Sequence, residues 1–216
     1  MDQIIITSGE KFTDIDTLAS SLAYSELLTK LGKDNTVVLP GPLNESITKS
    51  IKEWNLNYLS KLGNGEFSFV LIDISEKEFF SHFVKEDKII EIYDHHFGFD
   101  KYWREKLKND AHIEPVGSCA TLIWEEYGKR KIEISTLNAN LLYTAIFSNT
   151  LNFNSSVTTN RDREAFQNLL TYINLPDNWI ETYYKESENE IFKNPINAIA
   201  HDIKTVKYGE GKEVTI

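Results

Sequence analysis

Residues 67–73 read Phe-Ser-Phe-Val-Leu-Ile-Asp, and this stretch decides the fold class of the chain. It carries no polar residue between Ser68 and Asp73. A strand with one face in water alternates polar and apolar residues, whereas a strand covered on both faces reads as a continuous apolar run. The stretch therefore predicts a buried strand of a parallel sheet that helices cover on both sides.

Further strands are predicted before and after this stretch. Apolar, β-branched residues predict strands over 3–7, 36–39 and 88–93, and Ile113 begins a brief fifth strand. Helical spacing of apolar residues separates the strands, most clearly over 17–31. Because strands alternate with helices, we predict an α/β domain with an open, mainly parallel five-stranded sheet and helices on both faces.

The remaining segments are predicted to be helices and a terminal hairpin. Shorter helices are expected at residues 44–54, 76–84 and 118–127, and C-terminal helices from Ser135, over 161–173, over 177–192 and from Pro195. Residues 203–216 read as two short strands around a Gly-Glu-Gly turn, which is the pattern of a β-hairpin. Because two strands alone are marginally stable, the hairpin must pair with the main sheet, pair with another chain or begin a second domain.

The composition indicates an acidic globular chain. Lys and Arg total 23 against 33 Asp and Glu, which gives a formal net charge of −10. This charge disfavours binding of duplex nucleic acid, since such binding needs a basic face. Cys119 is the single cysteine, so no internal disulfide can form, and no stretch approaches the roughly 20 apolar residues that span a bilayer. We expect a cytoplasmic protein without a membrane partner.

Acidic residues follow three of the predicted strands. Asp14 and Asp16 lie in the loop after the first strand, Asp73 ends the third, and an Asp-His-His triplet at 94–96 follows the fourth. Ligands of an open parallel sheet bind outside the carboxyl ends of its strands, so all three groups are expected to meet at one edge. Each group alone has a plainer explanation, such as a helix cap, but together they predict a metal site.

The residue types in this cluster suggest phosphoryl chemistry. Carboxylates and imidazoles together suit Mn²⁺, Zn²⁺, Fe²⁺ or Co²⁺ better than Ca²⁺. Asp14 and Asp16 can face two neighbouring ions, and a carboxylate such as Asp73 can bridge them. Two ions about 3.5–4 Å apart can activate a water and neutralise charge on a phosphoryl group. The pattern therefore predicts cleavage of a phosphoester or a phosphoanhydride.

The same residues resemble, in order and spacing, the motifs of the DHH phosphoesterase superfamily. The first motif, roughly Gly-His-x-x-Pro-Asp-x-Asp-Ser, is similar to residues 9–17, and the second, an apolar strand ending in Asp, to residues 70–73. The third motif is the triplet at 94–96, and the fourth, usually Ser-Asp-Thr, is similar to residues 148–150. The resemblance covers residues 3 to about 200. It is strongest to the branch of manganese-dependent (family II) inorganic pyrophosphatases and exopolyphosphatases.

The resemblance implies roles for individual residues. One ion would be held by Glu10, Asp14 and Asp73, and a second by Asp16, Asp73, His95 and Asn149. His96 would face the substrate phosphate and Asp94 would orient a histidine or a water, which makes these two the expected catalytic residues. Ser118 at a helix start is a weaker phosphate contact, with a plain helix cap as the alternative. The expected cofactor is a divalent metal, Mn²⁺ ahead of Mg²⁺ or Co²⁺.

The chain departs from the family pattern in two ligand positions. Glu10 stands where the family has His, and Asn149 stands where it has Asp, so an altered metal preference is expected. We also expect most of the branch's second domain, which supplies basic residues to the substrate, to be missing. Lys11, Arg161 and Lys204 are candidates for that task, with ordinary surface charges as the alternative.

We therefore expect residues 1–192 to form a DHH-type metal-binding domain, and residues 193–216 to form a linker helix and the start of an incomplete second domain. The expected function is metal-dependent hydrolysis of pyrophosphate, short polyphosphate or a small phosphodiester. The alternative is a weakened or inactive binding or regulatory module, which the two altered ligand positions favour. The expected partners are a small phosphorylated substrate and a second copy of the chain, bound through an exposed strand edge.

Overall fold

The computed structural model describes residues 3–202, 205–208 and 212–215. Its main sheet has five parallel strands in the order β2-β1-β3-β4-β5. These strands are β1 (Gln3–Thr7), β2 (Asn35–Val37), β3 (Phe67–Ile72), β4 (Ile89–Asp94) and β5 (Ala111–Ile113). The predicted α/β class and parallel sheet are confirmed, and the apolar stretch that indicated them is the central strand.

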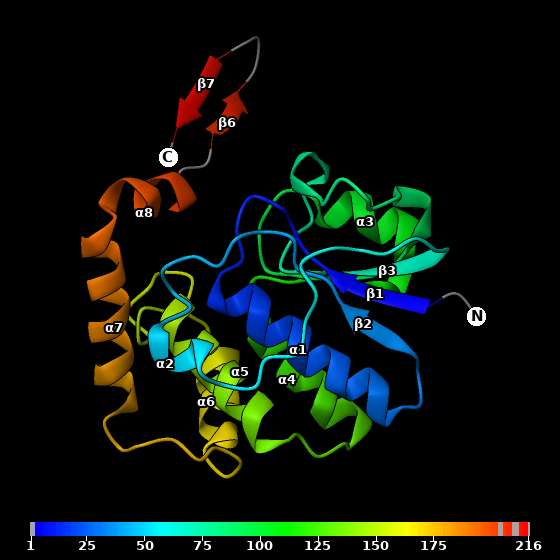
Figure 1. Cartoon of the computed structure of the whole chain (residues 1–216). Coiled ribbons are helices and arrows are strands. Elements are labelled where there is room, and N and C mark those ends of the chain that lie inside the picture. Colours follow the sequence, from blue (N-terminus) through cyan, green and yellow to red (C-terminus); the bar gives the residue numbers. More distant parts are fainter. Residues whose placement is uncertain (1–2, 203–204, 209–211, 216) are drawn as a thin grey trace.

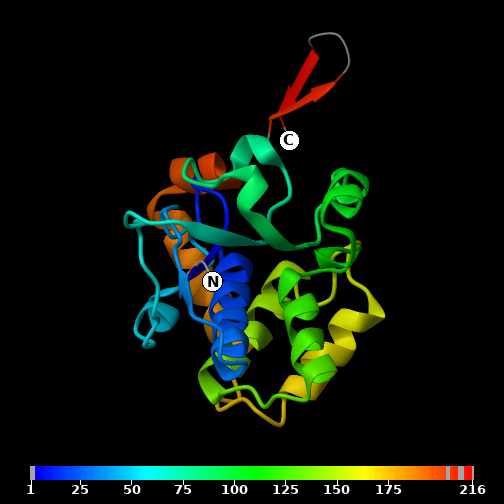
Figure 2. The same cartoon turned by 90° about the vertical axis from the view of Figure 1, so that its right-hand side faces the viewer.

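Helices cover both faces of the sheet (Figures 1 and 2). On one face, Val70 belongs to a core that it shares with residues of α1 (Ile15–Lys30), α4 (Cys119–Arg130) and α5 (Thr136–Asn149). On the other face, Leu71 belongs to a second core that includes Trp103 of α3 (Asp100–Leu107). Successive side chains of a strand point to opposite faces, so a strand between two dry faces needs apolar residues at every position.

Helix α1 begins at the edge of the sheet where the acidic loops lie. Asp14 is its N-cap, because the backbone N–H of Thr17 donates to Asp14 Oδ1 at 2.8 Å. Such a cap satisfies one of the backbone N–H groups that the first turn of a helix leaves unpaired. Every residue from Ile15 to Tyr24 is buried, so Asp16 lies inside the protein.

The predicted helix over 44–54 is wrong at its beginning. Helix α2 covers only Lys49–Lys52. The backbone N–H of Asn44 donates to Thr13 O at 2.9 Å, and the Asn44 side chain accepts from the backbone N–H of Ser46 at 3.0 Å. Because both contacts belong to a turn, Asn44 fixes the loop that crosses the site and does not cap a helix.

The predicted helix over 76–84 is wrong except for one 3-10 turn, η1 (Lys77–Phe79). Phe80 forms an antiparallel bridge with Gly9, and the Ser81 hydroxyl donates to Ser8 O at 2.7 Å. These contacts hold the segment extended beside the loop after β1. Helix α3 was missing from the sequence-based prediction because Trp103 is its single buried residue, and sequence periodicity detects helices by an apolar stripe.

Ser118 caps α4 as predicted, since its side chain accepts from the backbone N–H of Ala120. The helix does not end before Gly128, however, and continues to Arg130. The left-handed conformation that closes it falls on Lys131, whose φ is 55°.

The C-terminal part consists of α6 (Asn160–Leu169), α7 (Trp179–Lys193), α8 (Pro195–Asp202) and an antiparallel pair, β6 (Thr205–Tyr208) and β7 (Lys212–Thr215). The strands of the predicted hairpin are thereby confirmed, while its turn at 209–211 lies outside the described residues. The pair forms a sheet of its own and projects from the body of the protein (Figure 1). The division at residue 192 stays a prediction. Among the residues that the structure describes, no helix has the length and apolarity to cross a membrane.

Leu18→Ala tests the packing of α1 against the sheet. Leu18 is fully buried, so the substitution should lower the free energy of unfolding by about 2–5 kcal/mol. Leu31→Ala is the control, because Leu31 is 41% exposed and its loss should cost about 0.5 kcal/mol or less. Urea denaturation measures both. If both variants lost the same free energy of unfolding, Leu18 would not be packed between α1 and the sheet.

Candidate metal centre

Three loops meet where the parallel strands end, and Asp73 lies between them. Asp73 directly follows β3 with a φ of 61°, a left-handed conformation that Asp tolerates better than most residues. Its backbone N–H donates to Tyr93 O at 2.7 Å. The hydroxyl of Thr17 donates to Asp73 Oδ2 at 2.8 Å. Thr17 was not predicted as a site residue, and it fixes the direction of the Asp73 carboxylate.

The other carboxylate oxygen, Asp73 Oδ1, is buried and has no hydrogen-bond partner. His95 Nε2 lies 3.4 Å from it. Asp73, His95 and His96 each offer one ligand atom, and these atoms all lie within 4.8 Å of one another. Two ligands of one ion, each about 2.1 Å from it, lie about 3–4 Å apart. The side chains therefore fit a divalent metal, as the sequence predicts for Asp73 and His95.

The charges of the cluster favour a cation. Burial raises the pKa of Asp73, but the nearby His95, whose Nε2 lies 3.4 Å from Oδ1, outweighs it and holds that pKa below its usual range. Burial lowers the pKa of His95, and Asp73 and Asp16 more than compensate, so that it rises to about 10. Burial and Asp73 together raise the pKa of Asp14. In the metal-free protein, a proton on His95 therefore supplies the positive charge that these carboxylates need.

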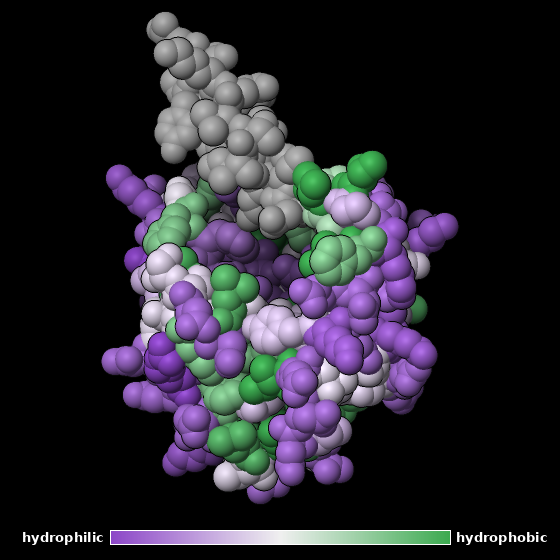
Figure 3. Space-filling view, turned by 90° about the vertical axis from the view of Figure 1, so that its left-hand side faces the viewer, coloured by the Kyte–Doolittle hydropathy of each residue, from purple (hydrophilic) through white to green (hydrophobic). Residues whose placement is uncertain are grey.

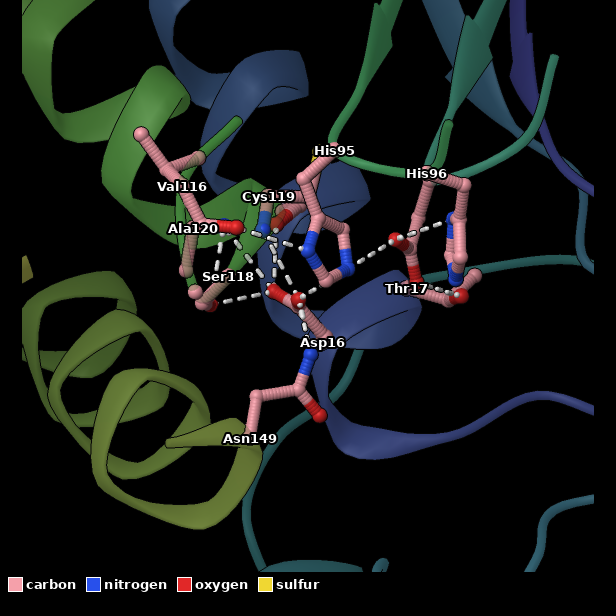
Figure 4. A network of polar contacts seen from close by, with 12 residues as sticks. Asp16, Thr17, His95, His96, Val116, Ser118, Cys119, Ala120 and Asn149 are labelled. Atoms are coloured by element: carbon pink, nitrogen blue, oxygen red, sulfur yellow. Dashed lines mark hydrogen bonds and ion pairs between the residues drawn. The ribbon is translucent and has the colours of Figure 1, made fainter. Parts of the chain in front are cut away.

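Asp16 is held by two helices (Figure 4). Its Oδ1 accepts from the Ser118 hydroxyl at 2.8 Å and from the backbone N–H of Ala120 at 2.9 Å. Its Oδ2 accepts from the backbone N–H of Cys119 at 2.8 Å and from Asn149 Nδ2 at 2.6 Å. The N-terminus of α4, a favourable place for an anion, is thus taken by a carboxylate of the chain itself. The Ser118 hydroxyl, predicted as a weak phosphate contact, points to Asp16.

Asp94 organises the two histidines that follow it. Asp94 Oδ1 accepts from the backbone N–H of His95 at 2.8 Å and from His96 Nδ1 at 2.7 Å. The Nδ1–H of His96 is therefore engaged, which leaves Nε2 as the ring nitrogen that can face a ligand. Asp94 thus fixes the orientation of the His96 ring, and its catalytic role stays a prediction.

A second group of contacts positions His95 through its other ring nitrogen, Nδ1. His95 Nδ1 lies 3.1 Å from Val116 O, which leaves Nε2 toward Asp73. The next residue, Gly117, donates its N–H to Asp162 Oδ2 at 2.9 Å. Asp162 also accepts from the Thr121 hydroxyl at 2.6 Å. Asp162 is fully buried and was not predicted as a site residue, because it lies 45 positions along the chain from the loop it holds.

Glu10 does not join this cluster among the described contacts. Its Oε2 accepts from the backbone N–H of His82 at 3.0 Å and lies 2.7 Å from His82 Nδ1. Of the three basic candidates, Arg161 pairs with Glu114 and Glu125 at 2.6 Å. Lys204 lies outside the described residues, and Lys11 lines a cavity beside the cluster.

Two cavities open beside the cluster. One, of about 310 Å³, is lined by Asp14, Asp73 and His96 and also by Lys11. The other, of about 690 Å³, is lined by Asp14, Asp73, His95, His96 and Asn149 and reaches Ile191 and Ile199 of α7 and α8. Figure 3 shows a hydrophilic hollow on the side of the molecule where α7 lies. Five of the predicted site residues therefore border space in which a small ligand can bind: Asp14, Asp73, His95, His96 and Asn149.

The order of these residues along the strand ends matches one known family. The chain matches the DHH family, N-terminal domain, over residues 3–146. It belongs to the DHH family. The resemblance seen in the sequence is thereby confirmed.

Relatives of this DHH-family chain include named pyrophosphatases. It is 31% identical to a probable manganese-dependent inorganic pyrophosphatase of Clostridium acetobutylicum, over 98% of this chain and 69% of that protein. It is 30% identical to one of Bacillus licheniformis, over 76% of this chain and 54% of that protein. A solved Methanococcus jannaschii structure, assigned to the family II inorganic pyrophosphatases, matches with a TM-score of 0.76 and 26% identity, over 99% of this chain and 70% of that chain. The chain thus spans from about half to seven tenths of its relatives.

Gly117→Ala tests whether the loop behind His95 positions the centre. The added Cβ would lie 2.6 Å from Thr150 Cγ2 and 3.0 Å from Asp162 Oδ2, so the loop must move. We expect Mn²⁺ affinity to fall about 10- to 100-fold in calorimetric titration. Gly128→Ala is the control, since nothing lies within 4 Å of the added Cβ; affinity should stay unchanged and stability should rise by about 0.5–1 kcal/mol. An unchanged affinity for Gly117→Ala would contradict the positioning role.

Metal binding should release a proton. The pKa of His95 is raised to about 10, so its imidazole is protonated at neutral pH and must lose that proton to bind a metal. We expect Mn²⁺ affinity to rise with pH toward about 10, and the observed binding enthalpy to vary with the ionisation enthalpy of the buffer. His82→Gln should release the same number of protons. A binding enthalpy that is independent of the buffer would refute proton release from His95.

Proposed function

We propose that the chain is a divalent-metal-dependent hydrolase of phosphoanhydride or phosphoester bonds. The observation that carries the proposal is the buried Asp73 Oδ1, which has no hydrogen-bond partner and faces His95. A buried anionic oxygen is costly unless a positive charge lies in front of it. Membership of the DHH family and the names of the relatives support the same assignment.

Asp73 and His95 are the ligands that we propose for the metal, with Asp14 beside them. Asp14 lines both cavities together with Asp73. Carboxylate and imidazole ligands suit Mn²⁺ or Co²⁺ better than Ca²⁺, and the relatives are named as manganese-dependent. A bound divalent ion would supply a water of lowered pKa and would neutralise charge on a phosphoryl group.

His96 is the residue that we propose to hold a proton for the substrate. Its Nδ1–H donates to Asp94 Oδ1 at 2.7 Å, so a second proton would sit on Nε2. Burial lowers the pKa of His96, but the hydrogen bond to Asp94 and the charge of Asp73 raise it overall. A cationic His96 can donate from Nε2 to a phosphate oxygen and stabilise the charge that develops as the bond to that oxygen breaks.

Pyrophosphate is the substrate that we propose first, followed by short polyphosphate and a small phosphodiester. The named relatives act on inorganic pyrophosphate by their printed names. The cavity of about 690 Å³ that Asp73, His95 and His96 line has room for two phosphoryl groups. Because the negative charge of pyrophosphate would need cations here, we expect the substrate to enter together with metal.

Phosphate release from pyrophosphate tests this function. We expect turnover with Mn²⁺, its loss on addition of EDTA, and a decrease in kcat/KM of about 100-fold or more for Asp73→Asn. Asp110→Asn is the matched control. Asp110 is exposed and directly precedes β5, so it lies at the amino end of this strand and away from the metal centre. Its activity should equal that of the wild type.

The substrate panel should contain pyrophosphate, tripolyphosphate and an aryl phosphodiester. Turnover of the diester alone would correct the substrate and keep the reaction class. Binding of Mn²⁺ without turnover of any of the three would refute the hydrolase proposal. It would favour the alternative of a binding or regulatory module.

A further inference from the structure

The described contacts pair one residue from each of the two expected ligand groups within the chain, Glu10 with His82 and Asp16 with Asn149. The family resemblance places two ions between Glu10, Asp14, Asp16, Asp73, His95 and Asn149. In the structure only Asp73 Oδ1, among the carboxylate oxygens of these residues, is buried without a partner. The two positions at which this chain departs from the family, Glu10 and Asn149, make the contacts that account for the difference.

Glu10 is turned away from the cluster by its backbone. Gly9 pairs with Phe80 in an antiparallel bridge, and Ser8 O accepts from the Ser81 hydroxyl at 2.7 Å. A Cβ on Gly9 would lie 3.0 Å from Phe79 O, so the two segments are in close contact. Glu10, the next residue, also contacts the segment that contains Phe80, because its side chain accepts from the backbone N–H of His82.

The Glu10 side chain pairs with His82 and extends toward the surface of the protein. Its Oε2 accepts from the backbone N–H of His82 at 3.0 Å and lies 2.7 Å from the imidazole Nδ1. The Glu10 side chain is 46% exposed and that of His82 is 77% exposed, whereas the side chains of Asp73 and His95 are 4% and 12% exposed. The ion pair therefore lies at the surface and not in the metal cavity.

Asn149 pairs with Asp16 within the chain, as His82 pairs with Glu10. Its amide Nδ2 donates to Asp16 Oδ2 at 2.6 Å. The Asp that the family has at this position could not donate and would place a second negative charge against Asp16. With Asn149, the backbone N–H groups of Cys119 and Ala120 and the Ser118 hydroxyl, both oxygens of Asp16 are satisfied without a metal. Burial and the charge of Asp73 still raise the pKa of Asp16 to about 7, but each of its two oxygens already accepts at least two hydrogen bonds, which occupy the lone pairs that a second ion would use.

We infer that this chain binds one divalent ion, at Asp73 and His95, and that Glu10 is a positioning residue that fixes the loop after β1 and not a metal ligand. The ion takes the place in front of Asp73 Oδ1. The inference rests on the proposed function only for the identity of the ion as Mn²⁺. It differs from the two-metal arrangement that the resemblance implies.

Metal stoichiometry tests the inference without substrate. Chelator-treated protein is titrated with Mn²⁺, bound metal is counted by mass spectrometry of the dialysed protein, and the bound ion is observed by electron paramagnetic resonance. We expect one ion per chain and the six-line spectrum of an isolated Mn²⁺. Two ions per chain, or the spectrum of a spin-coupled pair, would overturn the inference.

Glu10→Gln and His82→Gln form a matched pair for the role of Glu10. Each removes the same surface ion pair, so both should lower the melting temperature by the same small amount and leave the Mn²⁺ dissociation constant within about twofold of the wild type. If Glu10 is a ligand, Glu10→Gln alone will weaken Mn²⁺ binding about tenfold or more. That divergence between the two variants would refute the positioning role.

Asn149→Asp tests the reason for the missing second ion. Two carboxylates at the present 2.6 Å contact would need a cation between them, so we expect a second, weaker Mn²⁺ to bind. An unchanged stoichiometry would reject Asn149 as the cause. One ion without turnover refutes the proposed hydrolase and keeps this inference, whereas two ions with turnover do the opposite.

Discussion

The buried carboxylate of Asp16 accepts hydrogen bonds from the first turn of α4 and from the end of α5, and the rest of the centre depends on this contact. It joins α1 to segments that lie 102 to 133 positions further along the chain. Burying a carboxylate without such donors would cost several kcal/mol. The donors hold α1 and α4 together, and Thr17, the next residue of α1, then reaches Asp73.

That arrangement concentrates negative charge at the carboxyl ends of the strands. Asp14, Asp16, Asp73 and Asp94 all lie where strands end, and the histidines supply the nearest positive charge. Both oxygens of Asp16 accept hydrogen bonds from the chain itself, whereas Asp73 Oδ1 and Asp94 Oδ2 are buried without one, and only Asp73 Oδ1 has an imidazole nitrogen of His95 beside it. The same geometry that stabilises the helices therefore directs a cation to one place, and this connects packing with the proposed chemistry.

The DHH family motifs survive in this chain with changes that are mutually consistent. Replacing His by Glu at position 10 lets the side chain pair with His82 at the surface. Replacing Asp by Asn at position 149 converts a repulsive contact with Asp16 into a hydrogen bond. Each change lets a carboxylate of an expected ligand group pair within the chain, Glu10 at the surface and Asp16 in the interior. The sequence alone shows the substitutions, but it does not show that they act in the same direction.

The sheet, its strand ends and the side chains that gather there could be predicted from the amino-acid sequence. These depend on short-range patterns, since an apolar run such as 67–72 indicates burial and the residue after it is placed at the sheet edge. Which atoms of these side chains are paired depends on contacts between distant parts of the chain, and these could not be predicted. The contacts of Glu10 with His82, Thr17 with Asp73 and Gly117 with Asp162 span 72, 56 and 45 positions. Local propensity carries no information about such pairs, because each exists only once the sheet and helices have brought distant loops together.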